Sequence, residues 1–243
     1  MNSVPYHFVE EVIFRIDFDE KKPNEFCKLG GLFGRVGCHI AKERFYFMVT
    51  DGDEGAQNCV SLNTMRKYKP KYCNDIWLSG TEGSPFSSST ISAVGKVRPF
   101  SRSFHLEVAR GVISPKTVDL FSRMHVTSIG ITNFDDDLWN LTKRLVKAGT
   151  LGTVDIYTPL QEEQHVSVFL PLLVQPQFTV LCFMNYFPII VELMRELQKD
   201  HSNETDGKWI DFVVTSDAKF EEFAELFYGF QIENLQKIYR VCL

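Results

Sequence analysis

The stretch Val126–Gly149 reads VTSIGITNFDDDLWNLTKRLVKAG and contains the strand–helix unit that decides the fold. Residues 126–131 are rich in β-branched side chains, which is typical of a strand. Asn133 or Asp135 then offers a side-chain oxygen that can cap the first turn of a helix. We expect that helix to end at Gly149, because glycine tolerates the left-handed backbone that closes helices. The stretch therefore predicts one strand followed by one helix.

The same unit recurs along the C-terminal part of the chain. Apolar runs predict strands at 104–108, 126–131, 154–157, 178–183 and 209–214, and a final strand within 238–243. Between them the pattern predicts helices from Ser114-Pro115 to Met124, up to Ala148, over 161–174, over 188–199, and from Ser216 or Asp217 to Tyr228. Strands that alternate with helices indicate an α/β fold with a parallel sheet.

The strand starts fall near residues 104, 126, 154, 178 and 209, so the spacings are 22, 28, 24 and 31 residues. Strand–helix units of about 20–29 residues are the signature of a leucine-rich-repeat solenoid. The run from Val126 to Asn133 places its apolar residues and its Asn as such a repeat would. We therefore expect a repeat-like, curved parallel sheet over 103–243. A conventional open α/β domain is the alternative.

The first segment, 1–48, is predicted to be helical. Phe8, Val9, Val12, Ile13 and Ile16 fall on one face of a helix. Pro5 stands at its start, with Ser3 nearby as a cap. A second short helix is expected to carry Phe26, Leu29 and Phe33, and a third to run from about Val36 to Arg44.

The middle segment, 49–102, is interpreted as a connector. Asp51-Gly52 and Glu54-Gly55 are turn signals, and Gly80–Ser92 is rich in Gly and Ser, which predicts a flexible loop. A short strand is expected at Ile76–Leu78. The predicted organisation is thus 1–48, 49–102 and 103–243.

Charge and composition exclude several classes of function. The chain has 243 residues and a net charge of −5, which disfavours a nucleic-acid binder. The three segments carry 0, +2 and −7, so the acidic excess lies in the C-terminal part. Residues 164–191 lack charge, but three prolines interrupt them, so we expect no membrane span. Without a signal peptide at the N-terminus, we expect an intracellular protein, cytoplasmic or nuclear, with reduced cysteines that include Cys182 in the core.

No set of catalytic or metal-binding residues is apparent. Leu29–Val36 reads LGGLFGRV and resembles a kinase Gly-rich loop, but neither H-R-D nor D-F-G occurs in the chain. There is no G-x-S-x-G for a serine hydrolase, and no C-x-x-C or H-x-x-x-H pair for zinc. Asp135–Asp137 are explained by capping and the helix dipole. We expect no cofactor and no metal.

The N-terminal stretch Ser3-Val-Pro-Tyr-His-Phe-Val-Glu-Glu-Val-Ile13 resembles the opening of an F-box, in which an apolar residue and Pro precede a helix with apolar residues at this spacing. Phe26-Cys-Lys-Leu29 with Phe33 looks like its later helix, where an F-box has Val-Cys-x-x-Trp. Here Phe33 stands nearest to the usual Trp, and Gly30, Gly31, Gly34 and Gly37 weaken the expected helices. The chain as a whole is similar to the F-box-related proteins that are expanded in nematodes.

The resemblance implies an adaptor. In F-box proteins the helical motif packs on the linker subunit of a cullin–RING ubiquitin ligase, and the C-terminal domain recruits a protein substrate. It also implies that the docking contact is made by Val4, Pro5, Phe8, Val9, Val12 and Ile13. The alternative for this helix face is that it packs on the α/β part of the same chain. The alternatives for function are a small α/β enzyme with a divergent site, or an interaction protein unrelated to ubiquitin.

Overall fold

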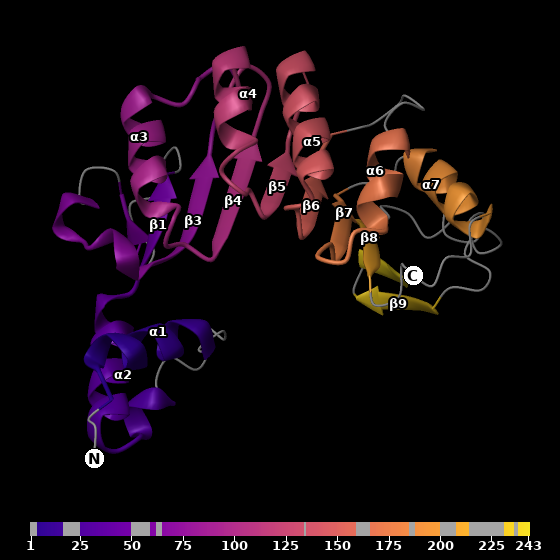
Figure 1. The fold of residues 1–243 in the computed structure, drawn as a ribbon. Coiled ribbons are helices and arrows are strands. Elements are labelled where there is room, and N and C mark those ends of the chain that lie inside the picture. The colour runs from indigo at the N-terminus through magenta and orange to yellow at the C-terminus, as the bar shows by residue number, and fades with distance from the viewer. Residues whose placement is uncertain are drawn as a thin grey trace.

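The computed structural model describes residues 4–16, 25–49, 59–61, 65–133, 135–158, 166–184, 188–199, 208–213, 231–235 and 238–243. A pair of N-terminal helices is followed by a mostly parallel sheet that alternates with helices, as the sequence predicts (Figure 1). The helices are α1 (Tyr6–Ile16), α2 (Gly31–Glu43), α3 (Ser88–Val97), α4 (Pro115–Phe121), α5 (Asp136–Ala148), α6 (Val166–Leu173) and α7 (Pro188–Lys199). Short 3-10 turns lie at Phe26–Lys28 (η1), Met65–Lys67 (η2) and Pro70–Tyr72 (η3).

The described strands form one sheet of ten, in the order β2-β1-β3-β4-β5-β6-β7-β8-β10-β9. They are β1 (Phe45–Val49), β2 (Cys59–Val60), β3 (Cys73–Ser79), β4 (Ser103–Val108), β5 (Ser128–Ile131), β6 (Thr153–Ile156), β7 (Val180–Phe183), β8 (Trp209–Val213), β9 (Gln231–Leu235) and β10 (Ile238–Cys242). From β3 to β8 each strand pairs in parallel with the next strand in the chain. The sheet ends in two antiparallel strands, β10 and β9.

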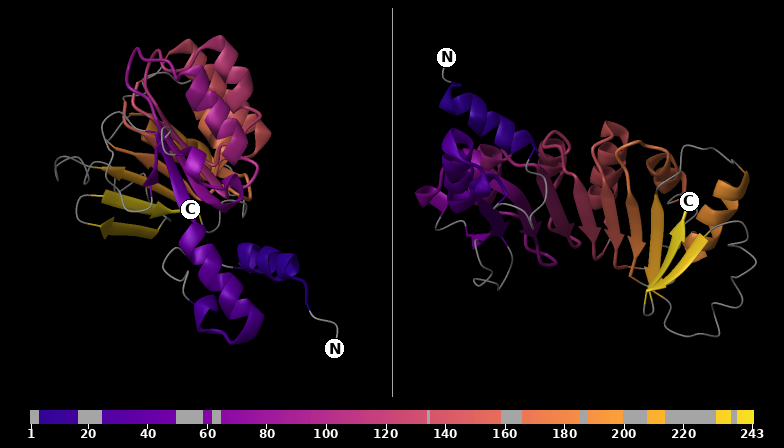
Figure 2. Two further views of the ribbon diagram at one scale, coloured as in Figure 1. Left: turned by 90° about the vertical axis from the view of Figure 1, so that its left-hand side faces the viewer. Right: turned by 90° about the horizontal axis from the view of Figure 1, so that it is seen from below.

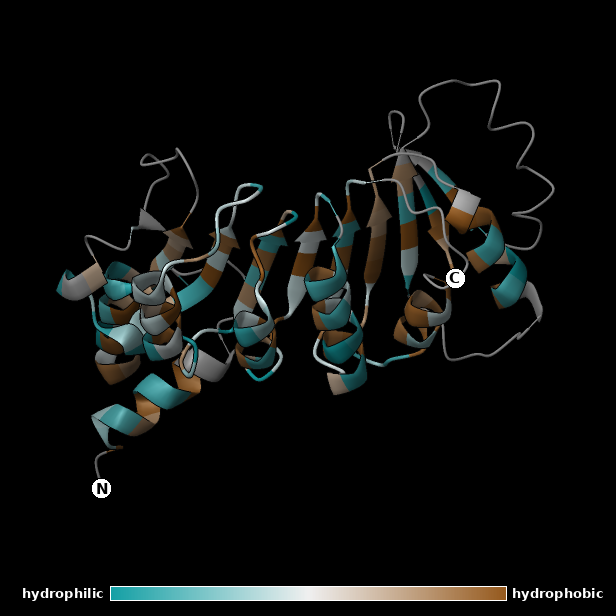
Figure 3. Ribbon diagram, turned by 90° about the horizontal axis from the view of Figure 1, so that it is seen from above, coloured by the Kyte–Doolittle hydropathy of each residue, from teal (hydrophilic) through white to brown (hydrophobic). Residues whose placement is uncertain are grey.

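The helices lie on one face of this sheet. Figures 1 and 3 show α3 to α7 in a row on the same side, with the strands forming the inner side of an arc. The interior between the two layers is filled by alternate strand residues, which are fully buried: Leu106, Val108, Ile129, Ile131, Val154, Ile156, Leu181, Phe183, Ile210 and Phe212. Because strand side chains alternate between faces, the intervening residues point away from the helices.

The strand–helix unit within 126–149 forms as predicted. The Asp135 side chain accepts a hydrogen bond from Leu138 N at 2.8 Å and caps α5. Gly149 ends the same helix in the left-handed conformation, with φ 65°. The predicted starts of α4 after Ser114 and of α7 at Pro188 are also confirmed.

Several boundaries differ from the predictions. Residues 88–92 were expected to belong to a loop, but they form the first half of α3, because the Ser87 side chain accepts a hydrogen bond from Thr90 N and caps it. The predicted strand at 76–78 is longer and lies inside the sheet, between β1 and β4. The last strand is confirmed but antiparallel. The helix expected after Ser216 lies outside the described residues.

The N-terminal helices also differ from their predicted lengths. The second helix is only the three-residue turn η1, and the third begins at Gly31 rather than near Val36. Gly37 lies inside α2, where a Cβ atom would stand 2.6 Å from Phe26 Cβ. The glycine therefore allows η1 to pack closely against α2, and this tertiary contact keeps a glycine-containing segment helical.

Candidate functional site

The face of the sheet opposite the helices is left uncovered by the described helices (Figure 2). The right-hand view of Figure 2 shows the strands of the sheet's centre in front of the helices, with the N-terminal helices at one end and β9 and β10 at the other. None of the described helices covers β4 to β7 on this side. The side chains on this face are thus candidates for binding.

Strand register places one line of side chains across the centre of this face, which we call the central row. The pairings align Ser79 with Glu107, Gly130, Asp155, Cys182, Asp211 and Arg240, one from each successive strand from β3 to β8 and then β10. Three of these seven residues are acidic. Since neighbouring strands lie about 4.8 Å apart, the acidic residues recur at about 10 Å.

The carboxylates of the central row affect one another. Burial, together with the charges of Glu107 and Asp211, raises the pKa of Asp155 to about 6. Arg240 compensates only Asp211: its Nε donates to Oδ1 and its Nη2 to Oδ2, both at 2.8 Å. In the described part of the chain, no cation pairs with Asp155 or Glu107. The row is therefore an unevenly neutralised acidic strip.

A second line of side chains runs across the strands beside the central row and contains aromatic and polar groups. The Trp77 ring stacks on the His105 ring with centroids 3.7 Å apart, and Trp77 is 41% exposed. His105 Nδ1 lies 2.8 Å from Ser128 Oγ on the next strand. Burial lowers the pKa of His105 to about 4, so the imidazole is neutral at pH 7. The His105 imidazole and the Ser128 hydroxyl can therefore form hydrogen bonds with a polar ligand.

Cys182 and Tyr157 also belong to this face. The expectation that Cys182 lies in the core is wrong: it is half-buried on the open face, because its neighbours Leu181 and Phe183 take the positions that face the helices. Burial and the charges of Asp155 and Asp211 raise the pKa of Cys182 to about 12, so it is a thiol at pH 7 and a weak nucleophile. Tyr157 is 38% exposed, and its ring lies beside Gly130.

The six residues assigned to partner docking by the F-box resemblance are split between the core and the surface. Val9 and Ile13 are buried against the rest of the chain, and Val12 is half-buried. Val4, Pro5 and Phe8 are exposed, with Phe8 at 57%. One face of α1 therefore packs on its own chain, while the start of the helix presents apolar groups to solvent.

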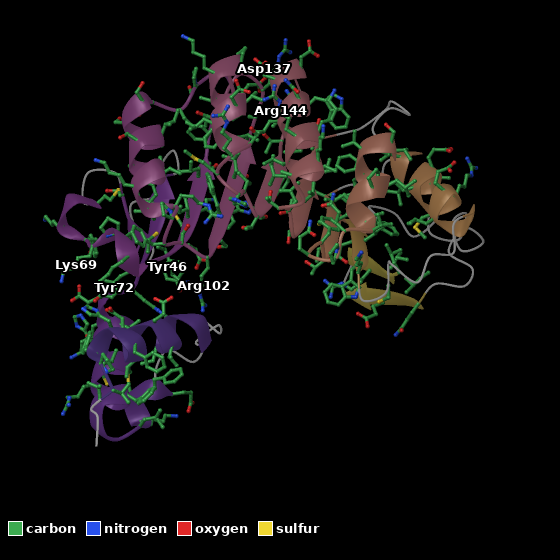
Figure 4. The ribbon with its side chains drawn as sticks, viewed as in Figure 1. Tyr46, Lys69, Tyr72, Arg102, Asp137 and Arg144 are labelled. Atoms are coloured by element: carbon green, nitrogen blue, oxygen red, sulfur yellow. The ribbon has the colours of Figure 1, made fainter. Side chains whose placement is uncertain are left out.

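Hydrogen bonds join the N-terminal helices to the start of the sheet. The buried Glu10 Oε1 accepts from Lys71 Nζ at 2.9 Å and from Tyr72 Oη at 3.0 Å, and Tyr72 Oη also lies 3.0 Å from His39 Nε2. Figure 4 shows Tyr72 at this junction. Lys71 and Tyr72 belong to a stretch in which basic and aromatic residues are interleaved, from Arg66 to Tyr72, so part of this stretch serves the junction.

An open pocket lies elsewhere on the helical part, between η1 and α2. Its volume is about 570 Å³, and its charged lining residues are Arg35 and Lys42, with Cys27, Cys38 and His39 beside them. Its wall includes Leu29, Gly31 and Gly34 of the LGGLFGRV stretch. The pocket is thus basic, in contrast to the sheet face.

In the described ranges, no three His, Cys, Asp or Glu side chains gather closely enough to hold a metal ion. Among the same residues no helix has the length and apolar character needed to cross a bilayer. Asp135, the first of three consecutive acids, accepts hydrogen bonds from Leu138 N and Gly111 N, which confirms capping as its role.

The acidic members of the central row were not singled out from the sequence, although a signal existed. Each is the middle residue of an apolar–acidic–apolar triplet within a predicted strand: Leu106-Glu107-Val108, Val154-Asp155-Ile156 and Ile210-Asp211-Phe212. Such triplets in successive strands indicate acids on one face. Strand register was needed to show that the three acids lie in line.

The chain matches no protein-family model and no curated protein sequence.

Proposed function

We propose that this chain is a non-catalytic adaptor that holds one protein at the start of α1 and another on the open face of the sheet. The observation that carries the proposal is the exposure of three large apolar side chains in the few residues at and just before the start of α1: Val4, Tyr6 and Phe8, exposed by 46%, 40% and 57%. It stands on a helix pair that extends from one end of the sheet (Figure 1). Large apolar side chains left exposed close together in the chain are a feature of protein-binding surfaces.

The architecture supports a leucine-rich-repeat-like interpretation of the α/β part. Each strand from β3 to β8 pairs with the next in the chain, and the helices lie on one face. In solenoid proteins such an arrangement leaves a long sheet face free for a partner. We therefore assign the recruited protein target to this face.

The F-box resemblance supplies the first partner. We assign the exposed residues Val4, Pro5 and Phe8 to the contact with the linker subunit of a cullin–RING ubiquitin ligase. Val9 and Ile13, which are buried, serve by holding α1 on α2 in the orientation that presents the exposed group.

A pull-down of the full chain with the purified linker subunit tests this assignment. The wild-type chain is expected to bind, and Pro5→Ala combined with Phe8→Ala is expected to abolish binding, because both residues are exposed and their truncation removes contact area without opening the core. Phe100→Ala is the matched control, since Phe100 is 52% exposed in the turn that follows α3. Absence of wild-type binding would end the ubiquitin-ligase assignment.

A small α/β enzyme is the second candidate, and the His105–Ser128 hydrogen bond favours it. A neutral imidazole beside a hydroxyl can act as a general base. Among the described residues no carboxylate orients the other ring nitrogen, and Trp77 stacks on the ring instead. Hydrolysis of a panel of activated esters, lost in Ser128→Ala, would support an enzyme over an adaptor.

A further inference from the structure

The central row combines uncompensated negative charge with an open surface. Glu107, Asp155 and Asp211 lie on every second strand, and only Asp211 has a cationic partner among the described residues. Separating carboxylates from water without a counter-charge is costly, and sequences retain such costs mainly at functional sites. A cation arriving from outside would relieve the repulsion.

Aromatic and apolar side chains flank the acids on both sides. The line with Trp77 and His105 lies on one side and reaches Trp209 on β8. The guanidinium carbon of Arg240 lies 4.9 Å from the centroid of the Trp209 ring. Tyr157 and Met184, 38% and 39% exposed, follow β6 and β7 on the other side. Aromatic faces attract ammonium and guanidinium groups, and they also bind extended peptide backbones.

The spacing of the acids indicates which peptide conformation would match them. Glu107, Asp155 and Asp211 recur at about 10 Å, because two inter-strand distances separate each from the next. A polyproline II segment has three residues per turn and rises about 3.1 Å per residue, so every third side chain falls on one side at about 9.3 Å intervals. Cations at every third residue would match the acidic residues.

We propose that the open sheet face binds a basic, extended segment of a partner protein, which crosses the strands and places Lys or Arg side chains on Glu107 and Asp155, the two acids of the central row that have no cationic partner among the described residues. The inference rests on the proposed adaptor function and gives the chemistry of the recruited target. The acidic row disfavours a nucleic acid, and a second copy of this chain would bring the same negative charge to the contact.

Binding of a labelled peptide to the full chain tests this proposal. The probe is fluorescein-labelled (Pro-Pro-Lys)₄, which has a cation at every third residue, and the comparison peptide is (Pro-Pro-Glu)₄. Fluorescence anisotropy at low salt is expected to show saturable binding of the lysine peptide alone. Glu107→Gln combined with Asp155→Asn is expected to weaken binding by a factor of roughly ten or more.

The control removes the same charge from the opposite side of the molecule. Asp119→Asn combined with Asp136→Asn changes exposed acids of α4 and α5. Figure 4 places Arg144, the ion-pair partner of Asp119, on the outer helical layer. This double variant is expected to bind the lysine peptide within about twofold of the wild type.

Three results of the peptide titrations would overturn the proposal: no binding of the lysine peptide, equal binding of the glutamate peptide, or equal weakening in both double variants. Self-association of the wild type in sedimentation, abolished by the Glu107 and Asp155 changes, would assign the face to a second copy and also overturn it. Failure of the linker pull-down leaves this test unaffected, since it depends on α1.

Discussion

The folded structure disfavours the ionised form of the Asp155 side chain. Burial and two neighbouring carboxylates raise its pKa from the usual 3.8 to about 6, so the folded chain binds this proton more tightly than the unfolded chain does. Stability is therefore lost as pH rises from about 4 through 6. Asp155→Asn is expected to raise the free energy of unfolding by roughly 1 kcal/mol at pH 7.5 and by nothing at pH 3.5. Urea unfolding at the two pH values measures this difference.

A control variant shows whether the change in stability comes from the environment of Asp155 or from the loss of any acidic residue. Asp119→Asn, which removes an exposed acid on the helical side, is the control and is expected to change stability little at either pH. A gain in Asp155→Asn that is the same at both pH values would contradict the prediction, because it would come from packing rather than from the carboxylate charge.

Two helices carry interior glycines with opposite roles. In α2 a Cβ at Gly37 would lie 2.6 Å from Phe26 Cβ, whereas in α3 a Cβ at Gly95 would meet no atom within 4 Å. Gly37→Ala is expected to lower the midpoint of thermal unfolding, because η1 must move away from α2. Gly95→Ala is expected to stabilise by about 0.5–1 kcal/mol through helix propensity alone. Stabilisation by both substitutions would show that the close packing of η1 on α2 contributes nothing.

At the scale of the whole molecule, Glu10 links α1 to the segment that leads into β3, through Lys71 and Tyr72. Burial acts to raise the pKa of Glu10, but hydrogen bonds from Lys71 and Tyr72 outweigh it, so the pKa lies below its usual value. A lowered pKa contributes stability above the unfolded-state value and loses it as pH falls through the folded value. Glu10→Ala is expected to cost roughly 1–3 kcal/mol at pH 7, because it leaves two donors without their acceptor.

Hydrogen exchange locates the effect of Glu10→Ala in the molecule. Amides of α1 are expected to exchange faster in the variant, whereas those of β5 and β6, remote along the sheet, keep their protection. Glu10→Gln keeps an acceptor oxygen and is expected to lose less stability. The difference between wild type and Glu10→Gln should vanish at low pH, and its persistence there would contradict the assigned charge effect.

Local patterns were sufficient for many of the elements. The cap at Asp135, the stop at Gly149 and the start of α7 at Pro188 are confirmed because each depends on a few neighbouring residues. The interpretation of 49–102 as a connector missed α3 and the full length of β3. The β3 residues alternate in burial, but the strand is fixed by hydrogen bonds to β1 and β4, which are remote in sequence or lie beyond a helix.

By itself, the sequence determined the succession of strands and helices and the alternation that buries one side of each strand. Local backbone preferences and the hydrophobic effect act along the chain, so these features are visible in it. Only the tertiary structure decided that Glu107, Asp155 and Asp211 stand in one line and that Val9 and Ile13 are buried while Phe8 is exposed. These facts depend on register and helix packing between segments tens of residues apart, where a shift by one residue would send each acid to the opposite face.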